Sequence, residues 1–166
     1  MSTSVSLRPI EAGDHSTVLA LNEAHVSLLS PLTPARLGAL LGWADRGDMI
    51  VVDGVVAGFV LTFAPGSAYD GAIFAECVSR FGDDFYYLDR VVVSDAFRRR
   101  GIAGRVYDEL ESVAAAYSRM TLEVMVEPPN EPSLAFHRAR GYADVVELGE
   151  PGHRVLMMAK ALTGQA

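Results

Sequence analysis

Cysteine, lysine and long apolar runs are all scarce in this chain of 166 residues. Cys77 is the only cysteine, which excludes an internal disulfide and fits a reducing cytoplasm. Although 50% of the residues are hydrophobic, no uninterrupted apolar run approaches the length of a membrane span. The first residues also lack the basic region and apolar core of a secretory signal. We therefore expect a cytoplasmic protein without a membrane partner.

Basic residues are outnumbered by acidic ones, and the formal net charge is −7. This balance argues against nucleic acid as the main partner. His15, His25 and His153 show no metal-ligand spacing with cysteine or carboxylate residues, so no metal is predicted. The chain has no repeat and no break in composition, and its length suits one domain spanning residues 1–166.

Hydrophobic periodicity and turn residues predict strands alternating with helices. The predicted strands are 5–10, 49–52, 55–63, 86–93, 121–126, 142–148 and 154–162, and the predicted helices are 14–28, 33–44, 102–118 and 132–140. Asp53-Gly54 marks a tight hairpin, and Thr33-Pro34 is typical of a helix start. An α/β domain follows, with a mixed, mostly antiparallel sheet and helices on both of its faces.

The segment 64–84 is longer than a tight connection between two strands requires. Apolar residues recur in it at helical spacing, and Ser67 or Asp70 could cap the helix. This extra helical segment is a candidate substrate lid. A helix that only covers an exposed sheet edge is the alternative.

A glycine-bearing loop joins the strand Val91–Val93 to the next predicted helix. Unpaired N–H groups at a helix start, together with the helix dipole, form an anion cradle, and glycine lets a phosphate approach the backbone. A P-loop is excluded because the only lysine is Lys160, and the glycine spacing does not fit a Rossmann fingerprint. We expect a pyrophosphate to bind residues Arg98, Arg99, Arg100, Gly101, Ile102, Ala103 and Gly104. A solvated arginine turn is the alternative.

Two motifs together resemble the GNAT-type N-acetyltransferases. Arg98-x-x-Gly101-x-Ala103 resembles the loop with which that family binds the pyrophosphate of acetyl-coenzyme A, and Asn130-Glu131-Pro132-Ser133-Leu134-Ala135-Phe136-His137 opens its second motif. Tyr87-Leu88-Asp89-Arg90-Val91-Val92-Val93, joined to Glu127-Pro128-Pro129-Asn130, resembles a bacterial subgroup of predicted acetyltransferases without an assigned substrate. The resemblance implies two splayed parallel central strands and acetyl-CoA as co-substrate.

The resemblance also implies how the coenzyme binds. Backbone groups of Val91 and Val93 would hold the pantetheine amides, and an N–H near Val92 would polarise the thioester carbonyl. Asn130 and Ser133 would meet the pantetheine or hydrogen-bond the loop. Either residue could instead cap the following helix.

Asp89 and Glu123 are the candidate general bases, because each is an acidic residue in an otherwise apolar strand. Leu122-Glu123-Val124 resembles the segment in which the ribosomal-protein acetyltransferases of the family carry a glutamate base. Asp89 and Arg90 are neighbours on a strand, so their side chains should point to opposite faces and should not pair. Both carboxylates could instead be solvated or structural.

His137 stands where most GNAT members have the tyrosine that protonates the leaving thiolate. Histidine has a reference pKa of about 6.5 against about 10 for tyrosine, so it donates only while protonated or through water. The phosphinothricin-type acetyltransferases resemble this chain in having histidine here. The residue is a candidate general acid, a polar contact to the coenzyme sulfur, or a structural histidine.

The resemblance implies an acyl-CoA-dependent N-acyltransferase that moves an acetyl group to a primary amine in a ternary complex. An acyl-CoA-binding module without turnover, or an interaction domain whose arginine turn binds an anion, are the alternatives. The acceptor, a small molecule or a peptide, is not identified by the sequence. Whether the protein is a monomer or a homodimer is likewise open.

Overall fold

A computed structural model describes residues 2–163, and within them a single sheet of seven strands has the order β1-β2-β3-β4-β5-β7-β6. Neighbouring strands are antiparallel, except for the parallel pair β4 and β5. The strands are β1 (Val5–Pro9), β2 (Arg46–Val52), β3 (Val55–Phe63), β4 (Tyr86–Val93), β5 (Arg119–Glu127), β6 (Ala143–Glu150) and β7 (His153–Ala161). The predicted α/β class with a mixed, mostly antiparallel sheet is confirmed.

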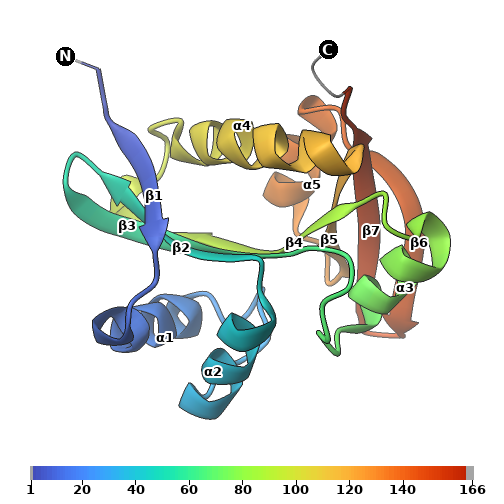
Figure 1. Ribbon diagram of the computed structural model, residues 1–166, viewed down its shortest axis with the longest axis horizontal. Coiled ribbons are helices and arrows are strands. Elements are labelled where there is room, and N and C mark those ends of the chain that lie inside the picture. Colours follow the sequence, from blue (N-terminus) through green and yellow to red (C-terminus); the bar gives the residue numbers. More distant parts are fainter. Residues whose placement is uncertain (1, 164–166) are drawn as a thin grey trace.

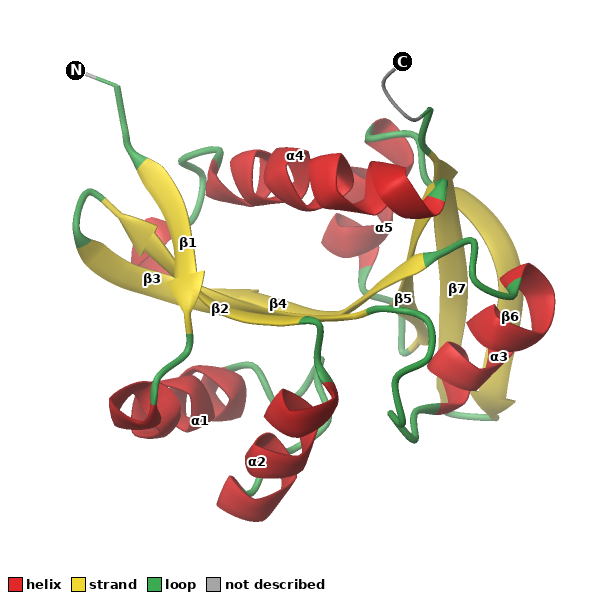
Figure 2. Ribbon diagram, in the orientation of Figure 1, coloured by secondary structure: helices red, strands yellow, loops and turns green. Residues whose placement is uncertain are grey.

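Helices cover both faces of this sheet (Figures 1 and 2). On one face lie α4 (Ile102–Ala114) and α5 (Glu131–Ala139), and on the other lie α1 (His15–Ala24) and α2 (Pro34–Trp43). The extra segment forms α3 (Ala72–Phe81), which packs beside β5 and the C-terminal strands. Within the part of the chain that the structure describes, no helix combines the length and the apolar character needed to cross a membrane.

The ends of the helices follow local chemistry in some places and tertiary contacts in others. Thr33 caps α2 as predicted, since its hydroxyl accepts a hydrogen bond from the Arg36 N–H at 3.0 Å. The apolar spacing predicted α1 as far as Leu28, but the helix ends at Ala24 and Leu28 is exposed. Gly71, and not Ser67 or Asp70, is the N-cap of α3. Asp70 instead forms a salt bridge with Arg36 at 2.6 Å.

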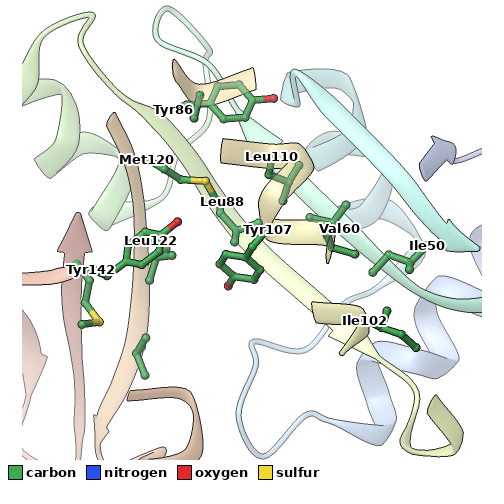
Figure 3. Packing of buried hydrophobic residues seen from close by; sticks show 14 of the residues in the cluster. Ile50, Val60, Tyr86, Leu88, Ile102, Tyr107, Leu110, Met120, Leu122 and Tyr142 are labelled. Carbon is green, nitrogen blue, oxygen red and sulfur yellow. The ribbon is translucent and has the colours of Figure 1, made fainter. Parts of the chain in front are cut away.

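Two hydrophobic clusters fill the space on either side of the sheet. The first packs α4 and α5 against the central strands, with Ile102, Val106 and Leu110 of α4 buried at helical spacing (Figure 3). The second packs α1, α2 and α3 against the opposite face and includes Phe59, Phe74 and Met157. Each cluster fixes one set of helices relative to β4 and β5, where the candidate site lies.

Candidate active site

The central strands β4 and β5 separate partway along their length. Only residues Tyr86–Leu88 of β4 pair with β5, where their partners are Met120–Leu122. Both strands continue beyond this point, β4 to Val93 and β5 to Glu127. The splay that the family resemblance implied is confirmed. Beyond the branch point the facing edges of the two strands offer backbone groups to a ligand.

The backbone direction of β4 is fixed by its pairing with β3. Ser94 donates its N–H to the carbonyl of Ala57 at 2.7 Å, and the register places Phe59 opposite Val92. Because hydrogen-bonded and non-hydrogen-bonded pairs alternate in an antiparallel ladder, the N–H and C=O of Val92 face β3. Those of Val91 and Val93 face the splay. An N–H near Val92 that faces the splay is therefore that of Val91 or Val93, and not that of Val92 itself.

Gly58 lets the two strands approach each other at this point. A Cβ on Gly58 would lie 1.9 Å from the carbonyl oxygen of Val92, a distance that real Cβ atoms do not reach. Gly58→Ala should therefore push β4 away from β3 and lower the free energy of unfolding by about 3 kcal/mol. Urea denaturation measures this change.

Gly38→Ala is the matched control, because Gly38 is an exposed position inside α2 where an added Cβ would have no atom within 4 Å. It should leave stability unchanged or raise it by about 0.5–1 kcal/mol. Equal unfolding midpoints for Gly58→Ala and the unmodified protein would contradict the close approach.

The start of α4 has the features of an anion site. Gly101 is the N-cap residue with φ +71°, and no side chain caps the helix. The first N–H groups of the helix are therefore available to a ligand. Ile102 contributes only its backbone, because its side chain is 2% exposed and belongs to the core.

The arginines of this loop lie at the surface near carboxylates. Arg98 donates from Nε to Asp95 at 2.8 Å, with both side chains well exposed, and Arg100 lies 3.8 Å from Asp53 and over the Phe97 ring. Exposed ion pairs of this kind contribute little free energy, so these guanidinium groups can exchange a carboxylate for a phosphate.

A cavity of about 740 Å³ extends through the splay and joins the two faces of the sheet. This volume is typical of small-molecule sites. Its wall takes in the segment 25–31, Tyr69, parts of β4, β5 and β7, and the facing sides of α4 and α5. Of the sequence-predicted site residues, the wall includes Asp89, Val91, Val92, Val93, Arg98, Ala103, Glu123, Asn130, Ser133 and His137.

Asp89 and Arg90 form a buried salt bridge, which corrects the sequence-based expectation. Arg90 donates from Nε to Asp89 Oδ2 at 2.9 Å, and the two side chains are 8% and 4% exposed. The cause is a β-bulge: Leu61 pairs with Arg90 and Thr62 with Leu88, so Asp89 is the extra residue. A bulge interrupts the alternation of side chains, and neighbours can then point the same way.

The second oxygen of Asp89 is also occupied. Tyr69 donates its hydroxyl hydrogen to Asp89 Oδ1 at 2.6 Å. With Arg90 on one oxygen and Tyr69 on the other, the carboxylate is fixed by two strong hydrogen bonds. This arrangement favours the structural role for Asp89.

Glu123 lies in the cavity in a different environment. Its neighbours Leu122 and Val124 belong to the core on the α4 face, so its own side chain points to the face covered by α1, α2 and α3. The residue is exposed to the cavity, and no salt bridge to it forms among the described residues. Enclosure by the cavity walls, together with the negative charge of Asp89, raises the pKa of Glu123 to about 7.

His137 is bound by the protein at both ring nitrogens. The carbonyl of Ser133 accepts from Nδ1 at 2.7 Å, which assigns the proton to that nitrogen, and Tyr107 donates its hydroxyl to Nε2 at 2.7 Å. Burial lowers the pKa of His137, so the neutral ring predominates at pH 7. In this form His137 presents no N–H to the cavity.

Asn130 and Ser133 organise the start of α5. Asn130 is its N-cap and accepts a hydrogen bond from the Ser133 N–H at 3.3 Å. The capping alternative considered for Asn130 is therefore confirmed. Both residues also line the cavity, and the Ser133 hydroxyl lies 3.2 Å from His137 Nδ1.

Sequence reasoning missed two tyrosines and a loop of the site. Tyr107 follows Ala103 by one helical turn on α4, so helical spacing could have placed its side chain beside the cavity. Tyr69 and the segment 25–31 lie in irregular connections, and only the folded chain brings them to the cavity wall. The rest of the extra segment, α3, packs against the sheet through Cys77, whose sulfur lies 3.4 Å from Thr121 Oγ1.

This chain is similar to known proteins both in its sequence pattern and in its fold. The model of the acetyltransferase (GNAT) family matches residues 20–142. Ard1 from Thermoplasma volcanium is similar in structure, with a TM-score of 0.74, 16% identity, and coverage of 95% of this chain and 97% of that one. So is the ribosomal-protein-S18-alanine N-acetyltransferase from Escherichia coli, with a TM-score of 0.70, 13% identity, and coverage of 98% and 97%.

An N-acetyltransferase from Staphylococcus aureus Mu50 has a TM-score of 0.70 and 16% identity, with coverage of 96% of this chain and 99% of that one. At such identities the structures show a shared fold. Among curated proteins, no sequence matches at a significant level. The family model covers most of the chain, including the splayed strands and the loop before α4. The chain therefore belongs to the GNAT acetyltransferase family.

Proposed function

We propose that this protein transfers an acetyl group from acetyl-CoA to a primary amine by direct attack in a ternary complex. The observation that carries the proposal is the cavity through the splay. Its wall takes in Arg98 and Ala103 at the start of α4 and the carboxylate of Glu123, which faces the opposite side of the sheet. One ligand can therefore enter from each face and meet the other between β4 and β5.

The residues present fit acetyl-CoA. The uncapped N–H groups of α4 and the arginines Arg98, Arg99 and Arg100 suit a pyrophosphate. The splay-facing backbone of Val91 and Val93 suits the amides of the pantetheine arm, and Asn130 and Ser133 lie on the opposite wall. When bound, acetyl-CoA supplies an activated thioester.

Glu123 is the proposed general base. A primary amine arrives as an ammonium ion and must lose a proton before its lone pair can attack. A carboxylate with a pKa of about 7 can accept that proton directly or through one water near neutral pH. Asp89, whose two oxygens are held by Tyr69 and Arg90, is fixed in place on the neighbouring strand.

The N–H of Val91, next to Val92, is the proposed donor to the thioester carbonyl, because it faces the splay. His137 fixes α5 against α4 through Tyr107 and does not supply a proton. A thiol has a reference pKa of about 8.5, so coenzyme A can depart as the thiolate. Through water in the cavity it then takes up the second proton that the amine nitrogen loses as the amide forms.

His137→Gln should lower kcat less than about threefold, because the ring holds two helices together and does not act on the reacting atoms. The free energy of unfolding should fall by about 1–3 kcal/mol, since the Ser133 carbonyl and the Tyr107 hydroxyl lose a buried partner. Steady-state kinetics and urea denaturation measure the two effects. Tyr107→Phe removes the hydrogen bond between Tyr107 and His137 from the α4 side, and it should change kcat and the free energy of unfolding in the same way. A 100-fold loss of kcat at unchanged stability would restore His137 as the acid.

Isothermal titration with acetyl-CoA and with CoA, followed by thiol release with a panel of small amines and peptides, tests the proposed function. Micromolar binding and release with one amine class would support it and identify the acceptor. Binding of acetyl-CoA without release by any amine would favour a binding module. No binding would contradict the pyrophosphate site at Arg98–Gly104.

A further inference from the structure

Two loops on the Glu123 side of the sheet meet at the β-bulge of β4. The first is the acceptor-side segment 25–31, which belongs to the connection between α1 and α2 and lines the cavity throughout its length. The second is the loop 64–71 before α3, which reaches the cavity through Tyr69. Both lie on the face opposite α4 and α5, from which an amine would reach Glu123.

Arg90 holds the first loop. From Nη1 it donates to Asn22 Oδ1 at 2.9 Å and to the carbonyl of Ser30 at 3.2 Å. Asn22 is fully buried and donates to the same carbonyl at 3.0 Å. Two donors therefore converge on one backbone oxygen near the end of segment 25–31.

Asp89 holds the second loop. The Tyr69 hydroxyl donates to it at 2.6 Å, and the Tyr69 ring stacks on Phe63 with centroids 4.1 Å apart. Since Asp89 is also bonded to Arg90, one continuous chain of hydrogen bonds runs from loop 64–71 to segment 25–31. In a buried network of this kind each hydrogen bond strengthens its neighbours, so the loss of one bond weakens the others.

We propose that Asp89 and Arg90 are positioning residues that couple the two loops and thereby fix the shape of the acceptor side of the cavity. The inference rests on the proposed function only in identifying this side of the cavity as the place where the acceptor binds. The coupling of the two loops follows from the hydrogen bonds alone. It assigns the carboxylate in the bulge to loop positioning and leaves Glu123 as the group that receives the proton. It also makes Tyr69 a determinant of acceptor binding.

Tyr69→Phe is the sharpest test, because it removes the hydroxyl and keeps the ring on Phe63. We expect amide hydrogen exchange in segment 25–31 to become about tenfold faster, although Tyr69 itself bonds to Asp89 and not to that segment. Exchange in the strands should not change. With the best amine from the panel, the acceptor KM should rise about tenfold while kcat and the KM for acetyl-CoA stay within twofold.

Asp70→Ala is the matched control. Asp70 lies in the same loop before α3 and accepts two hydrogen bonds from Arg36, at 2.6 and 2.9 Å, in an exposed position and without a hydrogen bond to Asp89. It should speed exchange in loop 64–71 and leave segment 25–31 unchanged. Asn22→Ala, which cuts the chain at its other end, should instead reproduce the effect of Tyr69→Phe on segment 25–31.

Unchanged exchange in segment 25–31 after Tyr69→Phe would overturn the coupling. Equal acceleration by Asp70→Ala would overturn it too, because it would show general loosening of the face. An acceptor KM unchanged in Tyr69→Phe would overturn the positioning role. Titration with acetyl-CoA tests the proposed function separately. The hydrogen-exchange pattern tests the coupling of the two loops, and it can be measured whether or not the protein binds acetyl-CoA.

Discussion

Replacing Glu123 by glutamine should lower kcat by about 100-fold or more while leaving the affinity for acetyl-CoA unchanged. Glutamine keeps the size of the side chain and cannot accept the proton of the attacking amine. Thiol-release kinetics and isothermal titration measure the two quantities. Glu147→Gln, an exposed change on β6, is the control and should keep full activity. Equal kcat for Glu123→Gln and the unmodified protein would remove Glu123 from the mechanism.

The pH profile gives the same hypothesis an independent readout. The pKa of Glu123 is raised to about 7, so kcat/KM should rise with pH through that value as the carboxylate forms. In Glu123→Gln this limb should disappear from the profile. A limb that persists at the same pH would belong to another group.

Stability should change in the opposite direction to activity. Glu123 titrates with a pKa of about 7 in the fold against 4.5 as its ordinary value, so the fold favours the neutral acid. The unfolded chain ionises first, and the folded protein loses stability as the pH rises from about 4.5 through about 7. Glu123→Gln should therefore raise Tm at pH 8 and have little effect at pH 4. A larger gain at pH 4 than at pH 8 would contradict this sign.

Gly101→Asp should weaken acetyl-CoA binding by at least about 100-fold, measured by isothermal titration. The new carboxylate would lie at the uncapped start of α4, where it would compete with a pyrophosphate for the same N–H groups and repel its charge. A Cβ at Gly101 would have no atom within 4 Å, so the substitution introduces backbone strain at φ +71° but no steric clash at Cβ.

Two variants separate charge from backbone strain at this position. Gly101→Asn has nearly the same shape as the aspartate and no charge, so it should bind more tightly than Gly101→Asp. Gly82→Asp places the same residue at another open glycine with positive φ, the C-cap of α3. Its backbone (φ +61°, ψ −114°) tolerates a side chain less well than the left-handed backbone of Gly101 (φ +71°, ψ 15°), so the variant should carry at least as much strain and still leave acetyl-CoA binding intact. Unchanged affinity in Gly101→Asp would remove the pyrophosphate from this loop.

Local chemistry explains which parts of the fold could be predicted. The hairpin at Asp53-Gly54, the cap at Thr33 and the buried face of α4 each depend on residues close in the sequence, and all are confirmed. The loop before α4 is local as well, because a glycine with positive φ is followed directly by a helix. The predicted length of α1 is wrong, because the helix ends at Ala24 and the apolar residues that continue the helical spacing to Leu28 lie in a loop.

The candidate residues differ in how far the sequence could assign them. Asp89 and Glu123 are each single carboxylates in apolar strands, and nothing local distinguishes them. The fold places Asp89 in a bulge between Arg90 and Tyr69 and leaves Glu123 free in the cavity. Likewise, His137 lies at the expected position on α5, but Tyr107 from another helix occupies its second ring nitrogen.

The sequence by itself therefore determined the element types, the order of the motifs and the loop at the start of α4. These depend on spacing and on the conformational preferences of neighbouring residues. Only the tertiary structure decided which carboxylate lies in the cavity without a salt bridge and which valines direct their backbone groups into the splay. It also decided which loops line the acceptor side of the cavity. Those properties depend on a register shift in a sheet and on the hydrogen bonds from Tyr69 to Asp89 and from Arg90 to Asn22, which join residues far apart along the chain.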